Sequence, residues 1–268
     1  MPQKWTCCQS PIISKPCANK DVHTVRSYAA RELEDQWRFF HTPYHRDDTH
    51  PKFARAVAID CEMGTNEYGE SELIRVSVID YFTGAVLLDK LVWPDVKMKH
   101  YNTKYSGVTA KAMHEARRGR TCLFGRGAAR KAIWKFVSPE TVVIGHAVHG
   151  DLVSLRWIHH RIVDTLLLEE ACARKERERI EREWAEEKEK KRQQAGEQPR
   201  EEPQEGEGKK KEEGPKIPQQ PMGLKALAKE RLDRMIQVRG RGHDSVEDAL
   251  ATRDLLHWHM THRAAKIQ

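Results

Sequence analysis

The sequence predicts an α/β domain built on a mixed five-stranded sheet, with three antiparallel strands, then parallel strands, and helices on both faces. Three β-prone runs follow one another through tight turns, which is typical of a hairpin or meander. Short apolar runs then alternate with segments of helical periodicity, which is typical of strands covered by helices. The length of 268 residues accommodates one such domain of about 150–200 residues with appendages.

The antiparallel strands come first. Residues 54–60 form an apolar run that ends at Asp60, and Glu62 and Gly64 follow. Residues 72–80 form a nearly continuous apolar run, and a turn leads into a third run at 85–93. These three strands are expected to be antiparallel neighbours.

The rest of the fold alternates. A polar connection spans 94–122, and an amphipathic helix is predicted within 124–137, before Pro139. Later elements are two short strands, a helix start that carries Asp151, a helix that begins after Gly223, and a closing helix through about Met260. The two strands are predicted at 141–145 and 162–165, and the second contains Asp164, which we interpret as structural.

Composition and charge narrow the function classes. Hydrophobic residues make up 38% of the chain and charged residues 32%, so part of the sequence is not expected to pack in a core. The net charge of +7 favours a polyanionic partner, with nucleic acid ahead of an acidic membrane surface. No apolar run is long enough to span a bilayer, and residues 1–30 lack a signal-peptide core. We expect a soluble intracellular protein with no membrane partner.

Residues 172–222 interrupt the pattern and are predicted to be a charged, low-complexity, disordered insertion. Between 174 and 192, 9 residues are basic and 7 acidic, and opposite charges at i,i+4 could support a solvated helix there. The segment from 193 to 221 is rich in Glu, Lys, Gln, Pro and Gly and lacks core-forming residues. Residues 188–192 and 209–211 could be nuclear-localisation patches or ordinary solvated charge.

Residues 1–50 are predicted to be a separate Cys/His-containing appendage. Cys7, Cys8, Cys17 and His23 supply the four ligands that a structural zinc site needs. Adjacent cysteines are an unusual way to bind one ion, so free or buried thiols remain the alternative. The main domain is then expected over 51–171 and 223–263.

Five side chains carry the functional prediction. Asp60 and Glu62 project from the same face of one strand, and their repulsion is relieved by a divalent cation with oxygen ligands. Taken alone, such a pair is more often a strand that runs into an acidic loop. Asp151, His243 and Asp248 lie at other strand-to-helix or loop-to-helix junctions, which converge at one edge of an α/β sheet.

These motifs resemble the DEDDh exonucleases of the ribonuclease H-like fold. The matching motifs are Asp60-x-Glu62, Gly145-His146-x4-Asp151 and His243-x4-Asp248, in the family's order. The runs at 58–63, 105–109 and 243–249 look most like the Rex-type RNA exonuclease branch, which includes exonucleases that process ribosomal RNA. The N-terminal cysteines also look like a leader of that branch. Ala147 stands where proofreading relatives place Asn, which weakens a proofreading interpretation.

The resemblance implies a two-metal-ion 3′→5′ exoribonuclease. Two Mg²⁺ or Mn²⁺ ions would be held by Asp60, Glu62, Asp151 and Asp248, with Asp60 bridging them and His243 as general base. Implied substrate contacts are Met63, Gly64, Ser106, Gly107, Thr109 and His146.

The expected substrate is the 3′ end of single-stranded RNA, in ribosomal RNA processing and in contact with pre-ribosomal particles. The expected location is the nucleus, with the nucleolus as the narrower expectation. Alternatives are a DNA-directed exonuclease and a catalytically weak RNA-binding or ribosome-assembly scaffold. The oligomeric state is not predicted.

Overall fold

The structure is a computed structural model that describes residues 11, 13–15, 28–44, 53–194, 214–218, 220–238, 240 and 242–264. The chain divides into two units, Met1–Arg38 and Phe39–Gln268. Within the described part of the first unit, Leu33–Trp37 forms a π-helical turn. The four predicted zinc ligands, Cys7, Cys8, Cys17 and His23, lie outside the described residues.

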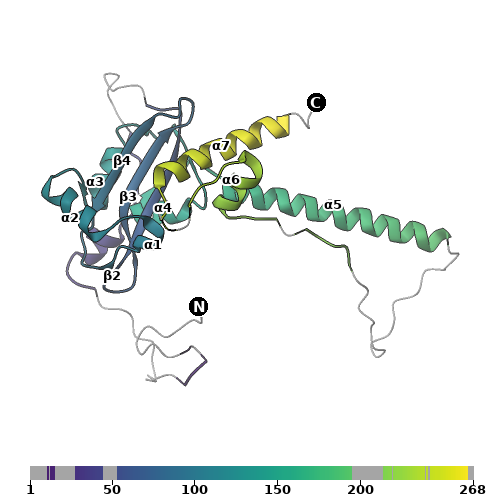
Figure 1. Cartoon of the computed structure of the whole chain (residues 1–268), viewed down its shortest axis with the longest axis horizontal. Coiled ribbons are helices and arrows are strands. Elements are labelled where there is room, and N and C mark those ends of the chain that lie inside the picture. Colours follow the sequence, from purple (N-terminus) through teal and green to yellow (C-terminus); the bar gives the residue numbers. More distant parts are fainter. Residues whose placement is uncertain are drawn as a thin grey trace. The chain divides into compact units, whose positions relative to one another are not determined.

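The second unit is built on a seven-stranded mixed sheet in the order β6-β4-β3-β2-β7-β9, with β5 paired to β2 (Figure 1). Strands β2, β3 and β4 are antiparallel neighbours, whereas β7 is parallel to β2 and β9 is parallel to β7. The strands are β2 (Ala56–Asn66), β3 (Ser71–Asp80), β4 (Val86–Trp93), β5 (Met98–His100), β6 (Leu123–Phe124), β7 (Val142–Gly145) and β9 (Ile162–Asp164).

The five predicted strands and their orientations are confirmed. The structure adds β5 and β6, which were not predicted because strands of two or three residues leave no periodicity to detect. The polar connection also contains two helices. The helices of this unit are α1 (Thr103–Ser106), α2 (Ala110–Arg118), α3 (Gly125–Ile133), α4 (His149–Leu155), α5 (Thr165–Gln194), α6 (Leu224–Leu232) and α7 (Ser245–Ala264).

Helices cover both faces of the sheet, as predicted. On one face, α3 and α4 bury Ala129, Ile133 and Leu155 against the side chains of Val57 and Ile59. On the other face, α7 packs onto the alternate residues of the central strands, and α6 packs onto α7. This contact joins Ala249 and Leu256 of α7 to residues of three strands, Ala58, Ile79 and Ile144. Because β2 is covered on both sides, most of its residues are buried.

Residues 39–44 belong to the second unit, which corrects the predicted appendage boundary at residue 50. Strand β1 (Phe40–His41) pairs in parallel with β8 (Trp157–Ile158). Thr42 anchors the segment, because its hydroxyl accepts a hydrogen bond from Trp157 Nε1 at 2.8 Å and lies 2.7 Å from His159 Nδ1. A two-residue strand whose partner lies 117 positions away cannot be detected from local sequence.

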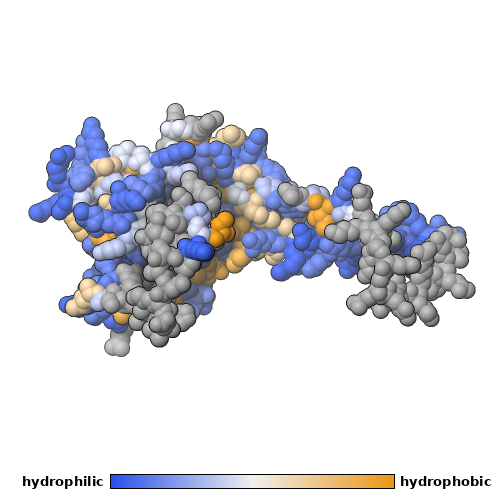
Figure 2. Space-filling view, turned by 90° about the horizontal axis from the view of Figure 1, so that it is seen from below, coloured by the Kyte–Doolittle hydropathy of each residue, from blue (hydrophilic) through white to orange (hydrophobic). Residues whose placement is uncertain are grey.

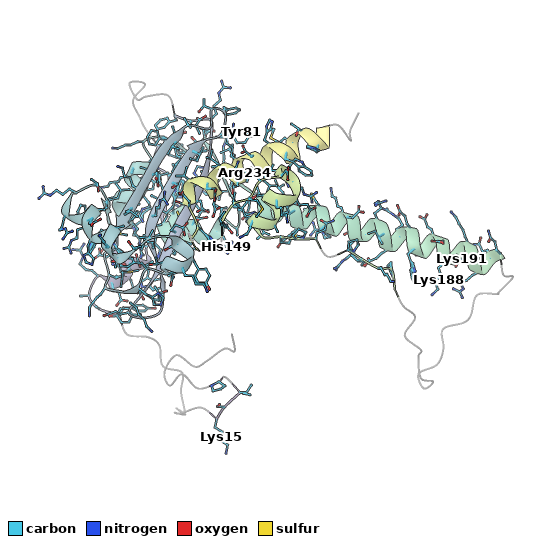
Figure 3. All side chains as sticks on the ribbon, viewed as in Figure 1. Lys15, Tyr81, His149, Lys188, Lys191 and Arg234 are labelled. Atoms are coloured by element: carbon cyan, nitrogen blue, oxygen red, sulfur yellow. The ribbon has the colours of Figure 1, made fainter. Side chains whose placement is uncertain are left out.

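Helix α5 corrects the predicted start of the disordered insertion, because residues 172–194 are helical. In Figure 1 its C-terminal part extends away from the sheet, and Lys188 and Lys191 lie along it (Figure 3). Arg179 forms ion pairs with Glu176 and with Glu183, three and four residues away. Such pairs support a helix whose surface is largely hydrophilic (Figure 2).

Residues 195–213, including the basic run at 209–211, lie outside the described residues. Residues 214–218 and 220–222 contain neither helix nor strand. None of the helices in the described parts of the chain has the length and apolar composition needed to cross a bilayer.

Candidate active site

The central strand β2 carries the first two acidic residues. Asp60 and Glu62 project from one face and lie opposite Ser77 and Arg75 of β3 in the sheet register. Glu62 is 6% exposed and Asp60 is half-buried. A register shift follows Glu62, so the regular ladder is interrupted next to the pair.

Asp151 is brought to this pair by the start of α4. Its Oδ1 accepts a hydrogen bond from the backbone N–H of Cys61, which stands between the two β2 acids, at 3.0 Å. The turn before α4 is held by Asp164, whose carboxylate accepts hydrogen bonds from the N–H groups of Ala147 and Val148 at 2.9 and 3.1 Å. Asp164 therefore has the structural role that the sequence predicts.

Asp248 and His243 come from the beginning of α7 and the loop before it. Asp248 is buried, and its Oδ2 accepts a hydrogen bond from Gln237 Nε2 at 2.9 Å. The same oxygen lies 3.7 Å from His243 Nδ1, whose side chain is 39% exposed. The backbone N–H of His243 donates to Tyr105 O, so α1 supports this loop. Asp248 is therefore buried, whereas the side chain of His243 is accessible to a substrate.

The carboxylates are close enough to disturb one another's ionisation. Burial raises the pKa of Asp60 well above its ordinary value, and the charges of Asp151 and Asp248 raise it further. Burial and the charge of Asp248 raise the pKa of Glu62 to about 8, against the opposing effect of Arg75. The four acids thus form one region of unfavourable negative charge.

The other two acids follow the same trend. Burial raises the pKa of Asp151 to about 7, although the N–H of Cys61 stabilises its charged form. Burial also raises the pKa of Asp248, and the hydrogen bond from Gln237 acts in the opposite direction. In each case removal of the carboxylate from water is the largest cause.

This donor set fits hard divalent cations. Glu62 Oε1 and Asp248 Oδ1 are buried oxygens without a hydrogen-bond partner, which is costly unless a cation or water serves them. All four acids offer oxygen ligands, the type that Mg²⁺ and Mn²⁺ prefer. Among the residues that the structure describes, no three His, Cys, Asp or Glu side chains are gathered closely enough to enclose an ion as they stand.

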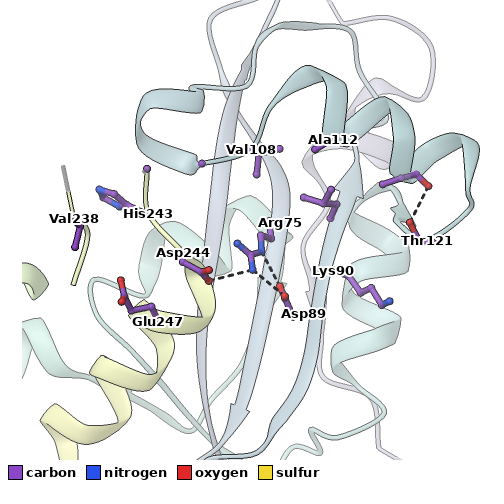
Figure 4. Close-up of a pocket in the computed structure, with 14 residues that line it drawn as sticks. Arg75, Asp89, Lys90, Val108, Ala112, Thr121, Val238, His243, Asp244 and Glu247 are labelled. Atoms are coloured by element: carbon purple, nitrogen blue, oxygen red, sulfur yellow. Dashed lines mark hydrogen bonds and ion pairs between the residues drawn. The ribbon is translucent and has the colours of Figure 1, made fainter. Parts of the chain in front are cut away.

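A cavity of about 610 Å³ opens beside His243 (Figure 4). One wall comes from β3 and β4, with Arg75, Asp89 and Lys90. The opposite wall comes from α2 and its preceding loop, and the segment that carries His243 and Asp244 closes a third side. His243 therefore lines a cavity that is large enough for part of a polymer substrate.

Three of the predicted substrate contacts pack against, or form hydrogen bonds with, other parts of the protein. Gly64 is buried against β5, where a Cβ atom would lie 2.5 Å from Met98 Cε. The Ser106 hydroxyl is buried and donates to Tyr101 O. Both ring nitrogens of His146 have protein partners, Thr165 Oγ1 at 2.9 Å and Met222 O at 3.0 Å. These residues form packing contacts and hydrogen bonds within the protein. A motif match does not distinguish this role from contact with a substrate.

The other three predicted contacts remain accessible. Gly107 lines the cavity and ends α1 at a φ of +67°, a conformation that favours glycine. Thr109 is exposed and caps α2 by accepting from Ala112 N at 3.1 Å. Met63 is half-buried beside Glu62. Their contact with a nucleotide stays a prediction.

Sequence reasoning missed Arg75 and Gln237. Arg75 lies opposite Glu62 and binds Asp89 through two hydrogen bonds of 2.8 and 3.0 Å. A single arginine inside the apolar run at 72–80 was a signal for it, because a charge in a buried strand requires a partner. Gln237, which binds Asp248, lies in an irregular segment, and nothing in the sequence marks it.

Comparison with known proteins gives partial matches, and no family model matches the sequence. RNA exonuclease 3 of Candida albicans is 30% identical over 167 residues, which cover 62% of this chain and 39% of that protein. Apoptosis-enhancing nuclease of Rattus norvegicus is 32% identical over 206 residues, or 75% and 48%. The Homo sapiens RNA exonuclease 1 homolog is 34% identical over 165 residues, or 62% and 12%. The chain thus spans less than half the length of these relatives.

Solved structures share the fold. The Neurospora crassa Pan2 catalytic unit (protease and nuclease domain) superposes with a TM-score of 0.54 at 17% identity, over 85% of this chain and 31% of that chain. The Saccharomyces cerevisiae Pan2 RNA exonuclease module in complex with AAGGA RNA gives a TM-score of 0.52 at 21% identity, over 81% and 31%.

Proposed function

Because this chain carries a ribonuclease H-like nuclease domain of the Rex-type branch of the DEDD exonucleases, we propose that it is a metal-dependent 3′→5′ exoribonuclease. The relatives confirm the family resemblance, while the activity of the whole protein is the proposal. The observation that carries it is that carboxylates from β2, α4 and α7 lie near enough for their charges to raise the pKa of Asp60, with the accessible His243 beside Asp248.

The four acids would hold two Mg²⁺ or Mn²⁺ ions. The buried oxygens of Glu62 and Asp248 that lack a hydrogen-bond partner support this assignment. When bound, the ions supply a water of lowered pKa and electrostatic stabilisation of the leaving oxygen. Gln237 and the N–H of Cys61 orient the acids of α7 and α4 in this arrangement. These supporting bonds keep the ligands in place when their charges repel.

His243 would act as the general base. Its side chain reaches the cavity, and neutral imidazole accepts a proton effectively near pH 7. Water attacks the phosphorus of the terminal phosphodiester, and His243 takes the proton that this water loses. The bond from phosphorus to the 3′ oxygen of the shortened chain breaks, that oxygen takes a proton from solvent, and a nucleoside 5′-monophosphate leaves.

RNA is the proposed substrate class. Relatives are named RNA exonucleases, a Pan2 module with this fold was solved with RNA, and the net charge of +7 suits a polyanion. We extend the proposal to the 3′ ends of ribosomal RNA precursors in the nucleus, supported by the Rex-type motifs and the basic runs.

The test uses the full chain with 5′-labelled single-stranded RNA and a DNA of the same sequence, each with Mg²⁺, Mn²⁺ or EDTA. We expect a ladder that shortens from the 3′ end of RNA, only when metal is present. Matching 3′-labelled RNA should lose its label in the first step. Faster degradation of DNA would reassign the substrate, and internal cuts or activity in EDTA would refute the proposal.

A further inference from the structure

Two polar contacts join the sheet to the start of α7, between His243 and Asp248. In the first, Arg75 Nη2 of β3 lies 3.3 Å from Asp244 Oδ1, the residue directly after His243 (Figure 4). In the second, the hydroxyl of Ser77 lies 2.7 Å from the hydroxyl of Ser245, and both serines are buried. We call these contacts the β3–α7 bracket.

Asp89 of β4 makes the bracket rigid. It accepts hydrogen bonds from Arg75 Nε at 2.8 Å and Nη2 at 3.0 Å, and a third from the Ser77 hydroxyl at 3.0 Å. A planar guanidinium held at two nitrogens has little freedom to turn. Arg75 is also only 19% exposed. Its side chain is therefore built into the wall of the cavity and is not a mobile cation within it.

The bracket acts on the segment that carries two of the five site residues. Asp244 Oδ1 also accepts from the N–H of Val246 at 3.0 Å, and Asp244 O accepts from the N–H of Asp248 at 2.9 Å. Asp244 thus caps the N-terminus of α7 and connects Arg75 to the helical turn that contains Asp248. In the sheet register, Arg75 and Ser77 lie opposite Glu62 and Asp60.

We infer that Arg75 is a positioning residue, which fixes His243 relative to the acids of β2 through Asp244. This inference rests on the proposed function for its consequence in turnover. The alternative for a cavity arginine is direct contact with a substrate phosphate. The commitment of both Nε and Nη2 to protein carboxylates favours positioning.

The experiment is a double-mutant cycle under single-turnover conditions with labelled single-stranded RNA. Arg75→Met is expected to lower the cleavage rate by about 10²-fold, the effect of a misplaced catalytic group, with little change in RNA affinity. In a His243→Ala background the same substitution should cause no further loss. Asp244→Asn, which weakens the bracket from the other side, should show the same dependence on His243.

Arg253 offers a matched control, since it joins α7 to the turn after β3, by donating to Tyr81 O from Nε, but lies farther along the helix. Arg253→Met should lower thermal stability without a His243-dependent loss of rate. Arg75→Lys should restore little, because an ammonium group cannot bind two carboxylate oxygens as a fork. A full loss that persists in the His243→Ala background, or a loss seen only in RNA affinity, would overturn the inference.

Amide hydrogen exchange provides a second readout that needs no turnover. Arg75→Met should accelerate exchange in residues 243–248, and Arg253→Met should not. Unchanged exchange in this segment would refute the positioning role. A wild-type chain that degrades no RNA would refute the proposed function alone, because exchange would still decide the role of Arg75.

Discussion

The acids of the site carry more negative charge than the fold accommodates well. Glu62 and Asp248 each leave a buried oxygen without a hydrogen-bond partner, and burial raises the pKa of Glu62 to about 8. Such an arrangement costs stability in a protein without metal and provides affinity for a cation. We make three predictions about single residues of this site.

The first concerns Asp60. Asp60→Ala should abolish RNA cleavage because it removes the acid whose ionisation both Asp151 and Asp248 influence, and with it one of the proposed metal ligands. The melting temperature without metal should be equal to or above that of the wild type, because repulsion is relieved. Cleavage assays and thermal denaturation in EDTA measure both effects. Glu140→Ala, at an exposed acid, serves as the control. A variant that unfolds, or one that cleaves normally, would exclude the metal role.

The second concerns His243. His243→Ala should reduce kcat by a factor of about 10²–10⁴, the usual contribution of a general base. Titration with Mn²⁺ should show metal affinity little changed. His149→Ala, at an exposed histidine of α4, should leave kcat unaltered. If the loss appeared in metal affinity, His243 would be a ligand instead.

The third concerns pH. The pKa of Glu62 is raised to about 8 and that of Asp151 to about 7, whereas these groups titrate near 4 when unfolded. From about pH 5 to about pH 8 the folded state therefore binds more protons, so the free energy of unfolding should fall as pH rises. Chemical denaturation in EDTA measures this slope.

Glu62→Gln should flatten that slope, and the surface variant Glu140→Gln should not. Adding Mg²⁺ should stabilise the wild type more at pH 8 than at pH 5, since ligands must be deprotonated to bind. Equal slopes for wild type and Glu62→Gln would contradict the raised pKa.

At the scale of elements, the turn between β7 and α4 decides where Asp151 lies. Asp164 accepts N–H groups of Ala147, Val148 and Leu166. Asp164→Ala should lower the free energy of unfolding by about 1–3 kcal/mol, because buried donors lose their acceptor. The cleavage rate should fall as well, since Asp151 loses its support.

Asp80 provides the comparison, because it accepts the N–H groups of Phe82 and Thr83 in a turn remote from the acids. Asp80→Ala should cost stability without a fall in kcat. If Asp164→Ala and Asp80→Ala lowered kcat equally for the same loss of stability, the β7–α4 turn would have no special role in positioning Asp151.

At the scale of the whole molecule, the outer part of α5 and the segment after it contribute none of the five site residues. Replacing residues 180–216 by a flexible Gly/Ser linker should therefore leave kcat on a short oligonucleotide unchanged. Met222 must be kept, because its carbonyl binds His146. Binding of a long RNA should lose part of its salt dependence if the basic residues of α5 contact phosphates. Loss of turnover on the short substrate would instead make this segment part of the enzyme.

The sequence by itself determined the five main strands and their order, because apolar runs and tight turns are local signals. It also indicated the five candidate site residues, because ordered motifs such as Asp60-x-Glu62 and His243-x4-Asp248 can be read directly from the linear chain. It could not reveal β5, β6 or the pairing of β1 with β8. Strands of two or three residues are stabilised by distant partners and carry no periodicity of their own.

Only the tertiary structure showed which candidate side chains already have hydrogen-bond partners within the protein. Ser106 and His146 match motifs, yet their polar atoms are consumed by Tyr101, Thr165 and Met222. Arg75 and Gln237 match no motif, yet Arg75 forms an ion pair with Asp244 and Gln237 donates a hydrogen bond to Asp248. The physical reason is that hydrogen bonds and charge interactions act through space, and the partners here stand up to 169 positions apart in the chain.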